Sequence, residues 1–367
     1  MALRENLSRL VSIIEEGPNF DLEEIKELIV DASEDDIRAS SKQFIQFCHV
    51  LTEALVRTKR SVSGIHLIGT AIIKFQQHRY QLTPIHSDFC LLCLDAKCLN
   101  PALAFLENDY TEIRKTDDKD DDVKRVMLFY YYGGLIYTAI KNFDRATFYF
   151  EVVLTVPATV VSPIVQETYK KFLILKVLLE GKLQDNILPK YTSQCITRHK
   201  KAIASPHYYK FAQEYASLNY EQISRLVNTY NAQFERDENM GLIKQCLTQV
   251  HRRNIQRLTK TFLTLPLRDV ATYVGLASEK EAEIYILNMI DDGEISATIN
   301  QKDGMVIFRD NTEKYDSVSV FQGLQDDMAT TMTLIKTLKK MEMDNAAGEP
   351  GVLTKPISDV CFQQAQR

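Results

Sequence analysis

Apolar residues recur at spacings of three and four through most of the first 260 positions of this chain of 367 residues. That period places apolar side chains on one face of an α-helix. Glycine and proline, which interrupt helices, are scarce at 13 and 10 residues. The pattern therefore predicts a mainly α chain built from stacked amphipathic helices.

An internal repeat is clearest between residues 130 and 157. Small and aromatic residues fall there at the offsets of a tetratricopeptide-like helical hairpin. Small residues suit the place where two helices approach closely, and aromatic residues fill the space between neighbouring hairpins. Two weaker copies precede it, so the sequence predicts a right-handed solenoid of helix pairs. The three sets are Thr52, Leu55, Gly64 and Ile68; Cys90, Cys93, Leu99, Ala102 and Leu106; and Gly134, Tyr137, Phe143, Ala146 and Phe150.

The pattern changes at Asn239, where a long helix is predicted, and Pro266 opens a shorter one. Ser278 with Glu281 forms a capping-box signature for a third helix. Alternating apolar and polar residues, an Asp-Gly turn and a returning strand follow within residues 295–308. Three helices and a two-strand hairpin together predict a winged helix with a small β-wing.

A single apolar stripe marks a last helix, predicted from about residue 320 to residue 343. Nothing within this helix covers the stripe, so another surface has to. The stripe comprises Phe321, Leu324, Met328, Ile335 and Leu338. The segment that follows is rich in Gly, Pro and polar residues and is predicted to be disordered.

These elements divide the chain into predicted domains. The first is a set of N-terminal helical repeats, the second combines further repeats with the winged helix, and the last helix and the disordered tail follow. Their ranges are 1–127 for the N-terminal repeats; 128–310 for the second domain, with repeats at 128–238 and the long helix plus winged helix at 239–310; 311–344 for the C-terminal amphipathic helix; and 345–367 for the tail.

The charge of the chain argues against a nucleic-acid partner. Its formal charge is −5, whereas binding to a phosphate backbone needs a surplus of Lys and Arg. The helix that would enter a DNA groove is mainly acidic, and its charges would repel phosphates. They are Glu279, Glu281, Glu283, Asp291, Asp292 and Glu294, against Lys280 alone. The winged helix is therefore predicted to bind protein.

One basic cluster lies on the long helix before the wing. It comprises Arg252, Arg253, Arg257 and Lys260, next to His251. Such a cluster is either a contact for RNA or an acidic partner, or the solvated face of a long helix. We favour the solvated face, because charge runs on helices usually have that role.

Metal-ligand residue types gather only at His86, Cys90, Cys93 and Cys98. All four fall within one hairpin, and two of them occupy interior repeat positions, so we interpret them as core residues. The acidic run at 117–122 lacks the Gly that an EF-hand loop needs at its sixth position, and we interpret it as a solvated loop. Motifs for hydrolases, metallopeptidases and dinucleotide-binding enzymes are absent. The sequence predicts no catalytic, cofactor-binding or metal site.

The first 14 residues lack the apolar segment of a secretory signal. No apolar run approaches the roughly 20 residues that a bilayer requires. The seven Cys follow no disulfide framework, which favours a reducing compartment. We therefore expect no membrane partner and a location in the cytoplasm and nucleus.

The order of helical hairpins, winged helix and C-terminal amphipathic helix resembles the PCI family, which supplies scaffold subunits of the proteasome lid, the signalosome and a translation initiation factor. Between about Phe44 and Lys314, several runs are most similar to the signalosome members of this family. They are residues 82–88 (LTPIHSD), 130–138 (YYYGGLIYT), 188–194 (LPKYTSQ), 239–247 (NMGLIKQCL), 254–265 (NIQRLTKTFLTL) and 291–306 (DDGEISATINQKDGMV).

The resemblance implies a non-catalytic scaffold. The signalosome removes the ubiquitin-like protein Nedd8 from the cullins of cullin-RING ubiquitin ligases, and its metal-dependent isopeptidase is another subunit. In the family, winged helices pair edge to edge and C-terminal helices gather into a bundle, and the neighbours implied here are signalosome subunits 1 and 8. The alternatives are a scaffold subunit of the proteasome lid or the initiation factor, and an RNA-binding adaptor.

Two interfaces follow from this resemblance. An unpaired wing edge is a template for strand addition by a neighbour, and the uncovered apolar stripe on the last helix suits a bundle. The residues expected at the wing edge are Glu294, Ile295, Ser296, Thr298, Met305 and Ile307.

Overall fold

The computed structural model describes residues 7–12, 14, 22–108, 110–114, 119–157, 161–181, 188–203, 205–309 and 318–348. It is mainly helical, as predicted. The helices of the first part are α2 (Leu22–Asp31), α3 (Glu34–Ala39), α4 (Ser41–Arg57), α5 (Ser61–Phe75), α6 (Ile85–Asp95), α7 (Asn100–Leu106), α8 (Lys119–Ala139), α9 (Phe143–Thr155), α10 (Pro163–Glu180), α11 (Gln194–Ile203), α12 (Ser205–Tyr215), α13 (Tyr220–Thr229) and α14 (Asn231–Arg236). The later helices are α15 (Met240–Thr261), α16 (Leu267–Val274), α17 (Glu279–Asp291) and α18 (Val318–Gly348).

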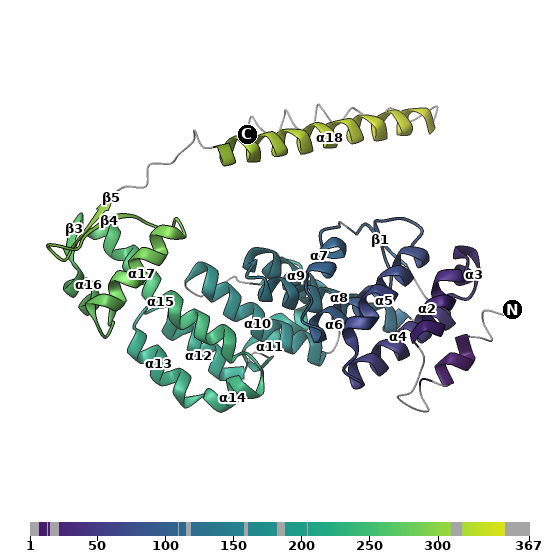
Figure 1. Ribbon diagram of the computed structural model, residues 1–367, viewed down its shortest axis with the longest axis horizontal. Coiled ribbons are helices and arrows are strands. Elements are labelled where there is room, and N and C mark those ends of the chain that lie inside the picture. The colour runs from purple at the N-terminus through teal and green to yellow at the C-terminus, as the bar shows by residue number, and fades with distance from the viewer. Residues whose placement is uncertain are drawn as a thin grey trace.

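The helices stack into an elongated array that runs from the N-terminal helices to the winged helix (Figure 1). Small residues lie where the helices of a pair approach closely, as predicted. A Cβ on Gly134 in α8 would lie 2.4 Å from Cε1 of Phe150 in α9, and a Cβ on Gly64 in α5 would lie 2.4 Å from Cδ1 of Leu55 in α4. Larger residues at these positions would push the two helices of each hairpin apart.

Two hydrophobic cores meet along α15. The first extends from Leu7 to Val250, and the second extends from Ile255 to Phe308. Because α15 contributes side chains to both, it is the element that joins the helical array to the winged helix. The predicted boundary between residues 127 and 128 needs correction, because it falls inside α8 and the first core continues across it.

The winged helix combines α15, α16 and α17 with a three-stranded antiparallel sheet. Its strands are β3 (Thr264–Pro266), β4 (Ser296–Asn300) and β5 (Met305–Arg309), in the order β3-β5-β4. The sheet therefore has one strand more than the predicted two-strand hairpin, because the prediction did not include β3. With only three residues, β3 is too short to show the alternation that identifies a strand in a sequence. The predicted cap is present, since Oγ of Ser278 accepts from the N–H of Glu281 at 3.3 Å.

Two further predictions are corrected at helix ends. The acidic run is not wholly a loop, because α8 begins at Lys119 and includes residues 120–122 in its first turn, where the helix dipole favours carboxylates. Residues 117 and 118 lie outside the described residues.

At the other end of the chain, α18 continues to Gly348, so residues 345–348 are helical and not part of a disordered tail. Ala346 and Ala347 are strong helix formers, which accounts for the extension. The predicted tail from 349 onward lies outside the described residues.

A short parallel pair, β1 (Gln81–Leu82) with β2 (Glu112–Ile113), joins the connections between successive hairpins. Within the described ranges, no helix combines the length and apolarity needed to span a membrane.

Candidate assembly surfaces

Arg252 joins the long helix α15 to the loop that leads into β4. Its guanidinium lies 2.7 Å from Oδ2 of Asp292 and 2.8 Å from Oε1 of Glu294. Burial opposes the charge of Arg252, but the hydrogen bond to Asp292 and the charge of Glu294 outweigh it, so the pKa of Arg252 is raised. The pair of contacts holds the start of β4 against the end of the helical array.

Arg253 caps the end of α10. Its Nη2 donates to the carbonyl oxygens of Leu178 at 2.7 Å and Leu179 at 2.8 Å. Gly181 has a φ of +77° and leaves the space that the guanidinium fills, since a Cβ there would lie 2.0 Å from Nη1 of Arg253. Of the predicted basic patch, Arg252 and Arg253 therefore bind within the chain, and Arg257 and Lys260 lie exposed on α15.

The backbone of β4 presents a free edge. The N–H of Phe308 in the central strand donates to the carbonyl oxygen of Leu263 at 2.8 Å, on the β3 side. Because N–H groups alternate in direction along a strand, the N–H of Ile307 faces β4 and its partner Thr298. The N–H groups of Ala297 and Ile299 in β4 consequently point away from the sheet, where a strand from another chain can pair with them.

The expected wing edge needs correction at three residues. Met305 and Ile307 lie on β5, which is paired on both sides, so the prediction that they lie at the edge is wrong. The side chain of Ile295 is only 7 % exposed and packs in the second core. Ser296 and Thr298 do lie on the edge strand β4, and Glu294 precedes it in contact with Arg252.

The stripe on α18 is uncovered. Every described side chain of this helix is exposed, including Phe321 at 66 % and Ile335 at 47 %. Figure 1 shows α18 standing clear of the other helices. Its members are separated by 3, 4, 7 and 3 residues, which matches the contact positions of a coiled coil except that Thr331 occupies the position between Met328 and Ile335. Its members are Phe321, Leu324, Met328, Ile335 and Leu338, with Met332 and Met341 beside them. A continuous exposed stripe of this kind is characteristic of a helix that packs on a partner.

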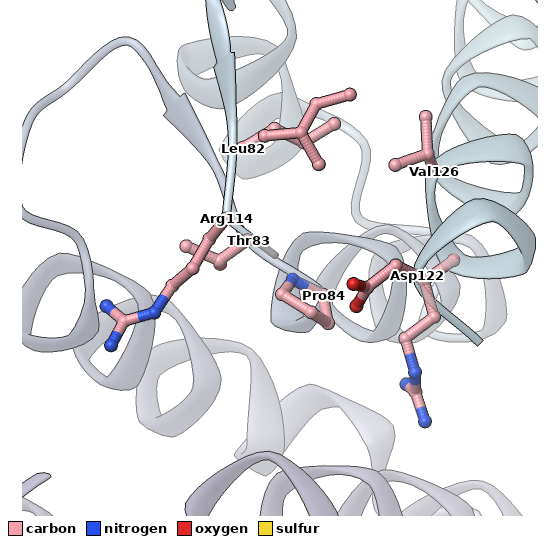
Figure 2. Close-up of a pocket in the computed structure, with 8 residues that line it drawn as sticks. Leu82, Thr83, Pro84, Arg114, Asp122 and Val126 are labelled. Carbon is pink, nitrogen blue, oxygen red and sulfur yellow. The ribbon is translucent and has the colours of Figure 1, made fainter. Parts of the chain in front are cut away.

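Figure 2 shows a hollow between β1, β2 and α8, lined in part by Leu82, Pro84 and Asp122. Its volume is about 10 Å³. That is room for roughly one water molecule, so this hollow is too small for a substrate.

The four residues that the sequence analysis interpreted as a core cluster, His86, Cys90, Cys93 and Cys98, differ in their burial. His86 is fully buried, and its Nδ1 accepts from the N–H of Thr83 at 3.1 Å. Burial lowers the pKa of His86 to about 4, so the ring is neutral at pH 7. Cys90 and Cys93 are buried core residues, as predicted, whereas Cys98 is exposed in the turn after α6, so the core interpretation is wrong for Cys98. Among the described residues, no group of three or more His, Cys, Asp or Glu is arranged to hold a metal ion.

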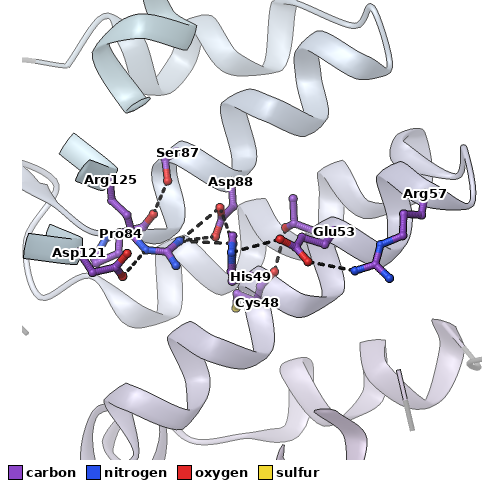
Figure 3. Close-up of polar contacts among 10 residues, drawn as sticks. Cys48, His49, Glu53, Arg57, Pro84, Ser87, Asp88, Asp121 and Arg125 are labelled. Carbon is purple, nitrogen blue, oxygen red and sulfur yellow. Dashed lines mark hydrogen bonds and ion pairs between the residues drawn. The ribbon is translucent and has the colours of Figure 1, made fainter. Parts of the chain in front are cut away.

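A polar brace crosses the N-terminal repeats (Figure 3). Asp88 in α6 lies 3.3 Å from both Nδ1 of His49 in α4 and Nη1 of Arg125 in α8. Arg125 also contacts Oδ2 of Asp121 at 2.8 Å. A buried carboxylate needs such partners, so we interpret the group as a brace between three helices.

A second polar network, which sequence reasoning did not find, fixes the start of α15. The fully buried Asn239 donates to the hydroxyl of Tyr208 at 2.8 Å and accepts from Nζ of Lys171 at 2.5 Å. Burial lowers the pKa of Lys171. The available signal was the pair Lys170 and Lys171 directly before the apolar run at residues 172–175, because a buried Lys requires a partner.

Comparison with known proteins assigns the family. A family model for the N-terminal helical repeats of COP9 signalosome complex subunit 3 matches residues 10–196, and a PCI domain model matches residues 227–310. COP9 signalosome complex subunit 3 of Drosophila melanogaster is 45 % identical over 322 residues, which cover 84 % of this chain and 72 % of the relative. The protein of the same name from Dictyostelium discoideum is 34 % identical over 310 residues, covering 84 % and 73 %.

The chain belongs to the COP9 signalosome subunit 3 family.

The candidate surfaces of this subunit 3 family member lie in the PCI match and in the segment after it. Arg252 and the free edge of β4 lie inside the PCI match. The stripe on α18 begins after the match ends at residue 310. The proposed contacts of α18 therefore rest on its exposed stripe and not on the PCI match.

Proposed function

We propose that this chain is a non-catalytic scaffold subunit of a COP9 signalosome, the complex that removes Nedd8 from the cullins of cullin-RING ligases. The observation that carries the proposal is α18, whose described side chains are all exposed along a continuous apolar stripe. Isolated amphipathic helices gain most of their stability by burying such a stripe. The family assignment supports the signalosome over the proteasome lid and the initiation factor as the assembly that buries it.

The proposed scaffold binds through two different kinds of contact. The stripe on α18 packs in a bundle with the C-terminal helices of other subunits, and the free edge of β4 pairs with a strand of a neighbouring winged helix. Arg252 keeps β4 in position through Asp292 and Glu294. We propose signalosome subunits 1 and 8 as the neighbours, and the cytoplasm and nucleus as the location.

The RNA-binding alternative is weakened by the contacts of its own residues. Arg252 binds two carboxylates and Arg253 binds two carbonyl groups. A phosphate backbone would have to displace both sets of contacts, and would then meet the acidic residues of α17.

The test of the bundle compares two double variants of the full chain. Leu324→Asp with Ile335→Asp places two charges on the stripe, and Thr330→Asp with Thr337→Asp places the same charges on exposed positions of the opposite face of α18. Because burying one Leu or Ile side chain contributes about 1.5–3 kcal/mol, we expect the stripe variant to recover at least about tenfold less of the other subunits. Affinity purification with quantitative mass spectrometry measures this, and also names the complex.

Full recovery of partners by the stripe variant would refute the bundle. Recovery of proteasome-lid or initiation-factor subunits by the unmodified chain would refute the signalosome assignment. The control variant is expected to recover partners normally, which separates a lost contact from a general effect of added charge.

The wing edge has its own test. Ala297→Pro removes an N–H group that points away from the sheet, so the pairing of β4 with β5 is retained while strand addition is blocked. Thr298→Pro instead removes an N–H that bonds to β5 and is expected to unfold the wing. We expect Ala297→Pro to keep its thermal unfolding temperature within a few degrees and to lose partners that contact the winged helix. Unchanged recovery of all partners would show that β4 does not accept a strand.

A further inference from the structure

Three successive helical hairpins present a lysine at the same strained backbone position. Lys59, Lys97 and Lys141 have φ values of 56°, 55° and 67° and lie in the turns α4–α5, α6–α7 and α8–α9. The three turns share one hydrogen-bond pattern, in which the residue after each lysine donates to the carbonyl five positions earlier. Gly or Asn adopts this conformation with less strain than Lys does. The turns themselves therefore do not require a lysine.

The three turns lie along one edge of the array. Oγ of Ser61, just after the first turn, donates to Asp95, just before the second. The hydroxyl of Tyr149 in α9 donates to the carbonyl oxygen of Leu106 in α7 at 2.6 Å, and the two residues lie eight and nine positions after Lys141 and Lys97. The first contact joins residues that each lie two positions from a lysine, and the second joins nearly equivalent positions of neighbouring hairpins. The three turns are therefore adjacent, and their lysines form a row.

The row is basic although the whole chain is acidic. All three lysine side chains are exposed, and none forms an ion pair with another residue in the described ranges. Arg57, Arg60 and Arg145 flank the row. The acidic side chains in the same turns and their flanks are Glu53, Asp95 and Asp144, of which Glu53 pairs with Arg57 and Asp95 accepts from Ser61. The basic ridge, defined by Lys59, Lys97 and Lys141, thus has an excess of positive charge.

A local explanation exists for each lysine alone. A cation after the last turn of a helix interacts favourably with the helix dipole. That explanation applies equally to the equivalent left-handed positions at Leu218 and Glu238, yet neither of them is basic. The lysines are confined to three adjacent hairpins, where together they create one surface.

We propose that the basic ridge binds an acidic, extended segment of a partner protein. Packed helices lie about 8–10 Å apart, and an extended chain rises about 3.3 Å per residue. Three residues of an extended chain span about 10 Å, so acidic residues at every third position of the segment can each contact one of the successive lysines. This surface lies in the N-terminal repeats and shares no residue with β4 or α18, so it provides a contact in addition to those of the proposed scaffold.

The test measures binding of a fluorescent peptide of about nine residues, with Glu at every third position and Ser or Gly between them, to the full chain at low salt. The ridge variant is Lys59→Asn with Lys97→Asn and Lys141→Asn, since Asn tolerates the left-handed conformation. The matched control is Lys124→Gln with Lys244→Gln and Lys302→Gln, which removes the same charge from exposed positions elsewhere. Thermal unfolding checks that both variants remain folded.

We expect the ridge variant to bind the peptide about tenfold more weakly and the control to bind within about twofold of the unmodified chain. A peptide of the same composition with its Glu residues clustered is expected to bind more weakly than the spaced one. Equal losses in the ridge and control variants, equal binding of the two peptides, or ridge-dependent binding of a short oligouridylate in preference to the peptide would each overturn the proposal.

Discussion

Helices α10 and α18 are both long and rich in apolar residues, yet their surroundings are opposite. In α10, Phe172, Leu173, Ile174 and Leu175 are consecutive and all buried, so the helix is covered around its whole circumference. In α18, apolar and polar residues are interspersed and every described side chain is exposed. A run of consecutive apolar residues separates the two cases: such a run requires burial on all sides in a core, whereas an apolar stripe on a helix with polar residues can be covered by one partner.

A matched pair of phenylalanines gives the largest expected effect. Phe172 in α10 is fully buried, whereas Phe321 in α18 is mostly exposed. We expect Phe172→Ala to lower the free energy of unfolding of the isolated chain by about 3–5 kcal/mol. Phe321→Ala is expected to change it by less than about 0.5 kcal/mol. Denaturant unfolding followed by circular dichroism measures both, and equal effects would remove the distinction between the two helices.

Acid is expected to destabilise the helical array, because His86 is buried there as a neutral ring. No such effect is expected in α18, because the described part of this helix contains no histidine. The folded chain holds the pKa of His86 at about 4, below the value of about 6.5 in an unfolded chain. As the pH falls from 6.5 to 4, the unfolded chain binds the proton first, and stability falls by about 3 kcal/mol in total. The contribution is fully present above pH 6.5. Unfolding curves across this range test it, and an equal pH slope in His86→Gln would contradict it.

The smallest expected difference in stability is between alanine substitutions at two glycines, one in α8 and one in α18. A Cβ at Gly134 would meet the ring of Phe150, whereas a Cβ at Gly323 in α18 would meet nothing within 4 Å. We expect Gly134→Ala to destabilise the chain by about 1–3 kcal/mol. Gly323→Ala is expected to stabilise α18 by up to about 1 kcal/mol, since Ala has the higher helix propensity. Thermal unfolding reports the first change, and slower amide exchange in α18 reports the second. Stabilisation by Gly134→Ala would show that its hairpin is less tightly packed than its contacts indicate.

The sequence predicts the parts of this fold that depend on local periodicity. The solenoid, the buried repeat positions such as Ala102 and Ala146, the cap at Ser278 and the stripe on α18 all follow from spacings within one helix or hairpin. Periodicity carries no information about pairing between distant segments. Arg252 and Asp292 are 40 positions apart, and Arg253 and Leu178 are 75 apart. For the same reason the sequence did not predict that β3 pairs with β5, and therefore did not predict that β5 is the central strand of the sheet.

The basic patch shows how this limit changes a functional interpretation. Four basic residues on one helix form a single cluster in the sequence, but in the structure two of them bind other parts of the chain. Arg257 and Lys260 alone lie exposed. A charge cluster is therefore an indication of a binding surface only after its internal partners are known.

Amide hydrogen exchange of the free chain and of the chain in its purified complex tests the scaffold proposal most directly. We predict that α18 and β4 gain strong protection in the complex, while α10, already buried in the free chain, changes little. Exchange in α18 that is equally fast in the free and assembled chain would contradict the claim that its stripe is an assembly surface.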